Sequence, residues 1–268
     1  MISNLINAIE FNELTLGYRD SLAVTEFSGA IKLGSLTAVV GANGSGKSTI
    51  FKGIIGALKP ISGNILFASH QEIAYLPQRS ELDLSFPARV FDFVSLGLWS
   101  KRGLLGRITS SDRQCIANAI EKVGLSEVLH KTIDNLSGGQ MQRAMFARVI
   151  VQDANIILLD EPFNAIDANT TIDLIDQVKA WHNEKRTIMV IMHDLNLVRK
   201  YFPNMILMAQ KPLAWGETSK LLTSQIPMAA RCSQSSEEME SACEVNNYVA
   251  FQSIHRQYCK GKNDVSTL

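Results

Sequence analysis

The chain has 268 residues, enough for one sizeable α/β domain or for a domain with a small appendage, and its content of 46% hydrophobic and 19% charged residues is typical of a packed globular protein. Its 26 basic and 26 acidic side chains give a formal net charge of zero, so we expect no nucleic-acid partner and no direct attraction to anionic lipid. No apolar run approaches the roughly 18 residues that cross a bilayer, and no secretion signal is visible, so any membrane role should depend on a partner protein.

The first part of the chain is predicted to contain short strands, because brief apolar runs alternate with glycines. The predicted strands cover residues 9–16, 23–31, 36–40, 64–67 and 73–76. A helix should begin at about Lys47 and run to Leu58, where Pro60 ends it.

After Pro77 the spacing of apolar residues becomes helical, from about Arg89 to Val151. Over residues 110–123 one face of the predicted helix carries Ile116, Ala119, Ile120 and Val123. We therefore predict an α-helical subdomain that is inserted into an α/β core.

The second half of the core is predicted from two continuous apolar runs, residues 155–160 and 187–192, which are typical of strands buried on both faces of a parallel sheet. A helix over residues 168–185 should join them. Its apolar face is predicted to comprise Ile172, Ile175, Val178 and Trp181. Beyond about residue 226 the pattern fades, and we expect a weakly structured tail.

A glycine-rich loop follows the strand at residues 36–40 and matches the pattern G-x-x-x-x-G-K-[ST]. Glycines let successive backbone amides turn toward phosphate oxygens at the start of a helix. Lys47 would bring a positive charge to the β and γ phosphates, and Ser48 would give Mg²⁺ a hydroxyl ligand. The alternative is a plain turn between strand and helix. The predicted phosphate cradle comprises Gly41, Asn43, Gly44, Ser45, Gly46, Lys47, Ser48 and Thr49.

The apolar run that begins at residue 155 ends in two carboxylates, Asp160 and Glu161. Ligands of open α/β sheets bind at the carboxyl ends of the strands. We expect Asp160 to hold Mg²⁺ and Glu161 to polarise the attacking water as a general base. The alternative is an acidic helix cap before Pro162.

Residues 136–140 read Leu-Ser-Gly-Gly-Gln, and Ser137 is a natural N-cap for a helix that runs to about Val151. Taken alone, this stretch could be an ordinary helix start. Together with the glycine loop it resembles the ATP-binding-cassette (ABC) ATPase family, over about residues 8–222. The resemblance implies an α/β fold, a P-loop core with a mixed sheet, N-terminal antiparallel strands and an inserted helical subdomain. It also implies ATP and Mg²⁺ as cofactors.

In the resembled family the pentapeptide contacts the nucleotide of a second subunit, so the resemblance implies a homodimer. The residues that would act on the partner's nucleotide are Ser137, Gly138, Gly139, Gln140 and Asp167. Asp167 could equally be the N-cap of the helix that follows it. The family more often has serine where this chain has Asn164.

The resemblance assigns three further roles. His193 would contact the γ-phosphate, Gln78 would touch Mg²⁺ or the attacking water, and Tyr18 would stack on adenine. A structural histidine, a loop glutamine and a solvent-facing strand tyrosine are the alternatives. The expected catalytic set is Glu161, His193, Lys47 and Gln78, and the expected Mg²⁺ ligands are Ser48, Gln78 and Asp160.

The expected ABC ATPase domain spans residues 1–225, followed by the tail at 226–268. Within the domain, the core should cover about 1–87 and 152–225, and the helical subdomain about 88–151. A single set of motifs and an insert without heptads set the chain apart from two-cassette translation factors and from relatives with coiled-coil arms.

A lone cassette resembles the ATPase subunits of bacterial importers, which implies a membrane permease, an indirect extracytoplasmic metal-binding protein and a peripheral position on the cytoplasmic face of the membrane. The stretches that resemble the metal-uptake branch, zinc or manganese above all, are 96–99, 103–107, 112–114, 161–167 and 214–218. An iron-chelate importer and a non-transport ATPase that dimerises with ATP are the alternatives.

Two regions outside these motifs carry weaker predictions. Residues 79–87, with Phe91, Phe93 and Trp99, should mostly be core of the helical subdomain and partly line a groove for a helix of the permease. The tail cysteines are expected to be reduced thiols, with a soft-metal site as the alternative; the residues concerned are Cys232, Cys243, Cys259 and His255.

Overall fold

The fold is described from a computed structural model, which covers residues 6–19, 21–68, 71–82, 87–103 and 106–223. The strands are β1 (Asn7–Tyr18), β2 (Ser21–Lys32), β3 (Leu36–Gly41), β4 (Ser62–Phe67), β5 (Ile73–Leu76), β6 (Ile156–Asp160), β7 (Thr187–Ile191), β8 (Asn204–Ala209) and β9 (Lys211–Glu217). The α-helices are α1 (Lys47–Ile54), α2 (Val90–Ser95), α3 (Trp99–Arg102), α4 (Ser110–Lys122), α5 (Gly138–Gln152), α6 (Ala168–Asn183), α7 (Leu195–Tyr201) and α8 (Thr218–Thr223).

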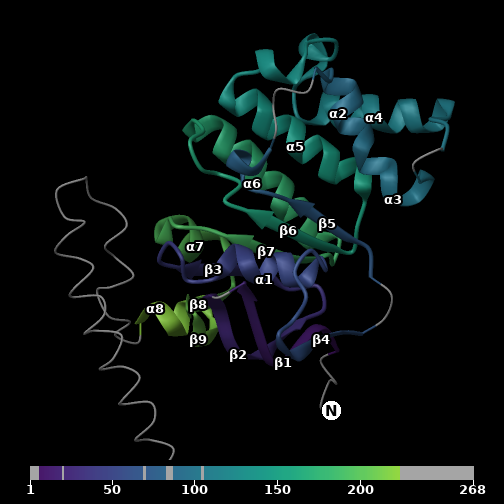
Figure 1. The fold of residues 1–268 in the computed structure, drawn as a ribbon. Helices are drawn as coiled ribbons and strands as arrows, with labels where there is room; N and C mark the ends of the chain where they lie inside the picture. Colours follow the sequence, from purple (N-terminus) through teal and green to yellow (C-terminus); the bar gives the residue numbers. More distant parts are fainter. Residues whose placement is uncertain (1–5, 20, 69–70, 83–86, 104–105, 224–268) are drawn as a thin grey trace, which may run out of the picture.

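Two sheets form the base of the molecule (Figure 1). Three antiparallel strands pair in the order β2-β1-β4, and six strands pair in the order β5-β6-β7-β3-β8-β9. The larger sheet is parallel except for β9, which runs antiparallel to β8. The predicted mixed α/β architecture with N-terminal antiparallel strands is therefore confirmed.

The central sheet is buried on both faces, as its apolar strands predict. Every residue of β6 and of β7 is buried. Alternation along β3 sends Ala38 and Val40 into the core that includes the helical subdomain, whereas Val39 joins α1 and the antiparallel sheet. The helix α1 thus lies between the two sheets, where Phe51 is fully buried.

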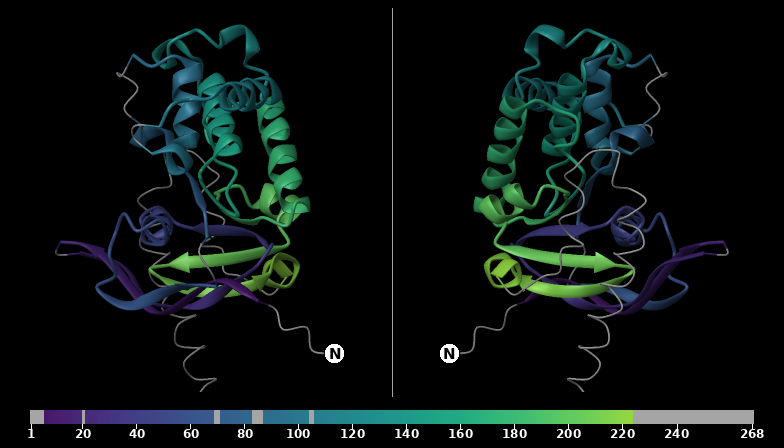
Figure 2. Two further views of the ribbon diagram at one scale, coloured as in Figure 1. Left: turned by 90° about the vertical axis from the view of Figure 1, so that its right-hand side faces the viewer. Right: turned by 90° about the vertical axis from the view of Figure 1, so that its left-hand side faces the viewer.

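Helices α2 to α5 form a layer on one side of the strands, as the side views in Figure 2 show. In α4 the predicted apolar face is confirmed, because Ile116, Ala119, Ile120 and Val123 are all buried. The α5 helix packs on α6 through a stacked pair of rings, Phe146 and Trp181, whose centroids are 5.8 Å apart and whose planes differ by 6°.

Two details of the predicted helices are wrong. The first is the end of α1, which stops at Ile54 instead of continuing to Leu58, because Gly56 adopts a left-handed φ of 74° that turns the chain. The second is Ile172, which is 52% exposed although it was placed on the buried face of α6. Steps of three residues drift around a helix, so Ile172 and Trp181 lie on opposite sides.

One whole prediction and parts of two others lie outside the described residues. These are the tail at 226–268, residues 83–86 of the predicted permease groove, and residues 104–105 of one stretch that resembles the metal-uptake branch.

The contact between α5 and α6 predicts a large loss of stability for Phe146→Ala. Removing this fully buried ring should lower the free energy of unfolding by about 3–5 kcal/mol, measured by urea denaturation. The control is Ile172→Ala on α6, which should cost less than about 0.5 kcal/mol because its side chain is half exposed. Equal losses for the two variants would contradict this packing.

Candidate functional site

The glycine-rich loop joins β3 to α1 and leaves its backbone open. Gly44 and Gly46 have φ values of 75° and 91°, which favour glycine. A Cβ on Gly46 would lie 2.5 Å from the carbonyl oxygen of Ala23, so no larger residue fits there without a shift. A Cβ on Gly44 would meet nothing within 4 Å, which leaves that side of the loop accessible to a ligand. The sequence therefore folds here into an open glycine loop between β3 and α1, where the phosphate cradle is predicted.

Lys47 begins α1 and is 5% exposed. Its Nζ donates to the carbonyl oxygens of Gly41 and Ala42, at 2.9 and 2.8 Å. Burial lowers the pKa of Lys47, while the carboxylates of Glu161 and Asp160 act in the opposite direction. In this arrangement the ammonium group is held by two carbonyl oxygens of the loop, and it could exchange these neutral partners for phosphate oxygens.

Asp160 ends β6 and is only 1% exposed. One carboxylate oxygen, Oδ2, accepts a hydrogen bond of 3.4 Å from the hydroxyl of Tyr75, and the other, Oδ1, has no partner. Burial raises the pKa of Asp160 to about 6, although the nearby hydroxyl of Ser48 opposes the shift. A buried carboxylate oxygen without a partner, beside a serine hydroxyl, is a donor set that fits Mg²⁺.

Glu161 follows Asp160 and has a positive φ of 48°, a strained conformation for a residue other than glycine. Its Oε1 lies 2.7 Å from Nε2 of His193, and its Oε2 accepts hydrogen bonds from Gln78 at 2.9 Å and Asn164 at 3.2 Å. The hydrogen bond with His193 is the main reason that the pKa of Glu161 lies below its ordinary value. Glu161 is thus held as a carboxylate with both oxygens engaged.

The topology explains why two residues that are distant in the sequence, Gln78 and His193, meet at Glu161. Gln78, Glu161 and His193 each follow closely after one of the strands β5, β6 and β7, which are adjacent and parallel. Their carboxyl ends therefore reach the same edge of the sheet.

Tyr18 ends β1 at the hairpin that leads into β2 and is 45% exposed. The neighbouring strand β2 lies against the glycine loop, since a Cβ on Gly46 would also come within 2.7 Å of Val24. Tyr18 is therefore exposed at the end of a strand whose hairpin partner lies beside the predicted phosphate cradle.

Residues 136–140 form the start of α5. Ser137 is its N-cap in a capping box. The backbone amide of Gln140 donates to Ser137 Oγ at 3.2 Å, and the backbone amide of Ser137 donates to the side-chain oxygen Oε1 of Gln140 at 3.1 Å. Gly138 lies against Arg79 and Ala165, and Gly139 lies against Asp167 and Thr170. The backbone of the pentapeptide thus lies beside the loop at residues 164–167 of its own chain, with little room between them for a side chain.

Asp167 is the N-cap of α6, the alternative that the sequence left open for it. Its two carboxylate oxygens accept from the backbone amide and the hydroxyl of Thr170, at 2.8 and 2.7 Å. These bonds lower the pKa of Asp167.

Three residues of the site were missed by sequence reasoning. Tyr75 reaches Asp160, Arg79 covers Gly138, and Arg143 of α5 contacts α6. The register of β5 with β6 places Tyr75 beside Leu158, and this register has no signature in the sequence. Arg143 is the only one with a usable signal, because it lies one turn beyond Gln140 on the same helix.

Within the described residues, no helix has both the length and the apolar composition needed to cross a membrane. The same part of the chain contains no cluster of three acidic, cysteine or histidine side chains suited to a metal ion. The tail cysteines and His255 lie outside the described residues.

Comparisons with known proteins agree with this geometry. The sequence profile of the ABC transporter family matches residues 24–164. The manganese transport system ATP-binding protein MntB of Listeria monocytogenes is 37% identical over 223 residues, which cover 81% of this chain and 93% of that protein. The zinc transport system ATP-binding protein TroB of Treponema pallidum is 35% identical and covers 84% of this chain and 86% of its own length.

Solved structures share the fold. CbiO1 from Clostridium perfringens, part of the ABC transporter complex CbiONQ, has a TM-score of 0.67 and 26% identity, covering 82% of this chain and 92% of its own. The bacterial ABC transporter cassette MJ0796, solved as a dimer, has a TM-score of 0.70 and 23% identity, covering 78% and 98%. The chain therefore belongs to the ABC transporter family, as an ATP-binding cassette that binds and hydrolyses ATP.

Proposed function

We propose that this cassette energises the uptake of a divalent metal ion, zinc or manganese, through a membrane permease. The observation that carries the choice of metal is the similarity to relatives named for manganese and zinc transport, at 37% and 35% identity over most of both chains. The cassette would lie on the cytoplasmic face of the membrane, attached only through the permease.

The hydrolytic step is proposed to depend on Glu161. A glutamate is ionised at neutral pH, and the lowered pKa of Glu161 keeps it in this base form, in which it can polarise a water molecule. Three donors, His193, Gln78 and Asn164, occupy most of the acceptor sites on its two oxygens, so movement of one of them would make room for a water molecule. His193 and Gln78 are therefore proposed to turn from Glu161 toward the γ-phosphate and its surroundings when ATP binds.

The nucleotide is proposed to bind across the glycine loop, with Tyr18 against the base. Lys47 would leave the carbonyls of Gly41 and Ala42 for the phosphates, a change from two neutral partners to charged ones. The cradle would donate backbone amides from residues 41–49. Ser48, Asp160 and Gln78 would hold Mg²⁺, which neutralises negative charge on the phosphates when it is bound.

A complete site is proposed to need two copies of the chain. Ser137, Gly138, Gly139, Gln140 and Asp167 of one subunit would close over the nucleotide of the other. The dimer reported for the cassette MJ0796 supports a pairing of this kind for the shared fold.

An apolar surface on the helical subdomain supports attachment to a permease. Leu96 and Trp99 are 45% and 51% exposed, whereas Phe93 belongs to the core. We propose that the exposed pair lines part of the groove that receives the permease helix.

Glu161→Gln should lower ATP turnover by at least about 100-fold while nucleotide binding persists, since the amide cannot act as a base. Steady-state phosphate release and binding of a fluorescent ATP analogue would measure the two effects. The ATP-bound variant should also accumulate as a dimer in sedimentation velocity. The control is Glu184→Gln, which changes a surface carboxylate paired with Arg186 and should leave turnover unchanged. Normal turnover in Glu161→Gln would remove the residue from the proposed role.

The choice of metal is tested by the element content of cells that lack this gene. Deleted cells are complemented with wild type or with Glu161→Gln and grown under limiting zinc, manganese or iron. We expect one of the first two metals to fall and only wild type to restore it. A fall in iron alone would favour a chelate importer, and unchanged metals would contradict the proposed cargo without affecting the ATPase.

A further inference from the structure

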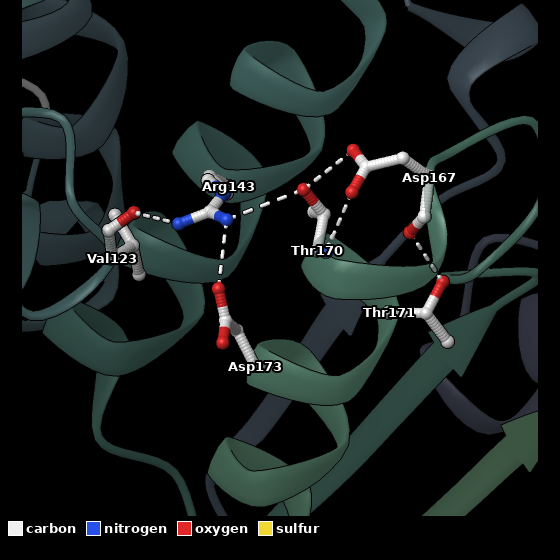
Figure 3. Close-up of polar contacts among 6 residues, drawn as sticks. All are labelled: Val123, Arg143, Asp167, Thr170, Thr171 and Asp173. Atoms are coloured by element: carbon white, nitrogen blue, oxygen red, sulfur yellow. Dashed lines mark hydrogen bonds and ion pairs between the residues drawn. The ribbon is translucent and has the colours of Figure 1, made fainter.

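Arg143, which is not among the predicted catalytic residues, links α5 to the end of α4 and to α6 (Figure 3). Its guanidinium donates to the carbonyl oxygen of Val123 at 3.1 Å, to the hydroxyl of Thr170 at 3.2 Å and to the carboxylate of Asp173 at 2.8 Å. The first partner follows the end of α4, and the other two lie on α6. The side chain of Arg143 thus links α5, whose N-cap is Ser137, to α6, whose N-cap is Asp167.

Thr170 connects Arg143 to Asp167 through hydrogen bonds. Its hydroxyl accepts from Arg143 and donates its own hydrogen to Asp167 Oδ2, at 2.7 Å. Its backbone amide donates to Asp167 Oδ1 at 2.8 Å. Both oxygens of Asp167 therefore have partners within the chain, and because Thr170 is only 5% exposed, water competes little for its hydroxyl.

The glycines of the pentapeptide pack against the same network. A Cβ on Gly139 would lie 3.6 Å from both Asp167 Oδ2 and Thr170 Oγ1, and a Cβ on Gly138 would lie 3.7 Å from the carbonyl oxygen of Ala165. The two segments expected to face a partner subunit, residues 136–140 and 164–167, therefore lie side by side, with room for little more than a methyl group between them. The stacked rings of Phe146 and Trp181 reinforce the junction farther along α5.

We propose that Arg143 and Thr170 are positioning residues that hold residues 136–140 and Asp167 as one rigid surface, so that both meet the second subunit together. This inference rests on the proposed function, in which that surface closes over the partner's ATP. Neither residue needs to touch nucleotide. Their effect is to keep the orientation of α5 fixed relative to α6 and to the Asp167 carboxylate.

The two contacts that Arg143 makes with α6, one to Thr170 and one to Asp173, should differ in how much they contribute to positioning Asp167. Asp173 is 59% exposed, and an ion pair at that exposure contributes little. The Thr170 hydroxyl is buried and shared between Arg143 and Asp167. The proposal therefore assigns the positioning role to the Thr170 contact and only a minor effect to Asp173.

The test measures ATP-dependent dimerisation by sedimentation equilibrium in the full-length Glu161→Gln protein, where hydrolysis does not interfere. Thr170→Val keeps the shape of the side chain but removes the hydroxyl, and Arg143→Met removes the guanidinium. Each is expected to weaken the ATP-bound dimer at least tenfold, while ATP affinity at low protein concentration changes less than twofold. Thr170→Ser should restore the dimer, and Asp173→Asn should weaken it less than threefold.

Arg186→Met is the matched control. Arg186 is as buried as Arg143, with side chains 21% and 23% exposed, and it also binds one backbone carbonyl and two side chains. It contacts Asp153 at the opposite end of α5, so its loss should lower thermal stability without weakening the dimer.

The outcomes separate this inference from the function on which it rests. Dimerisation of Thr170→Val and Arg143→Met equal to that of the parent would overturn the positioning role and leave the ATPase dimer intact. A tenfold weakening in Arg186→Met as well would overturn it too, since general destabilisation would then explain the loss. If the Glu161→Gln parent forms no dimer with ATP, the proposed paired site fails and this inference fails with it.

Discussion

The adjacency of three parallel strands is the constraint on which the rest of the site depends. The strands β5, β6 and β7 pair in that order and end at one edge of the central sheet. Their carboxyl ends bring Gln78, Glu161 and His193 to hydrogen-bond distance although the chain separates them widely. Any slip in this pairing would move Glu161 away from its two partners, because register sets the direction of every side chain.

The polar groups of the site are arranged for a ligand and not for the stability of the bare protein. Asp160 Oδ1 is buried without a partner, a situation that costs about 1–3 kcal/mol. Burial raises the pKa of Asp160 to about 6 and lowers the pKa of Lys47, so both charged forms are disfavoured where they stand. A bound nucleotide with its cation would offset both effects by supplying opposite charge to each group.

The local parts of this account could be predicted from the sequence, and the tertiary parts could not. The glycine loop, the N-cap at Ser137 and the buried strand before Asp160 depend on residues close together in the chain, so spacing and residue type suffice. The end of α1 was misplaced because Gly56 competes with Pro60 as the stop, and Gly56 acts first. Tyr75 and Arg143 were missed because their roles depend on which strand or helix lies beside them.

Each complete site is proposed to combine the glycine loop of one subunit with residues 136–140 of another. Mixing two inactive variants, Lys47→Ala and Ser137→Arg, tests this arrangement most directly; Ser137 lies at an exposed position. A mixed dimer contains one site with both parts intact, so equal mixing should restore roughly a quarter of wild-type ATPase activity. A mixture that stays inactive, although both variants fold and Ser137→Arg binds ATP, would contradict the shared site.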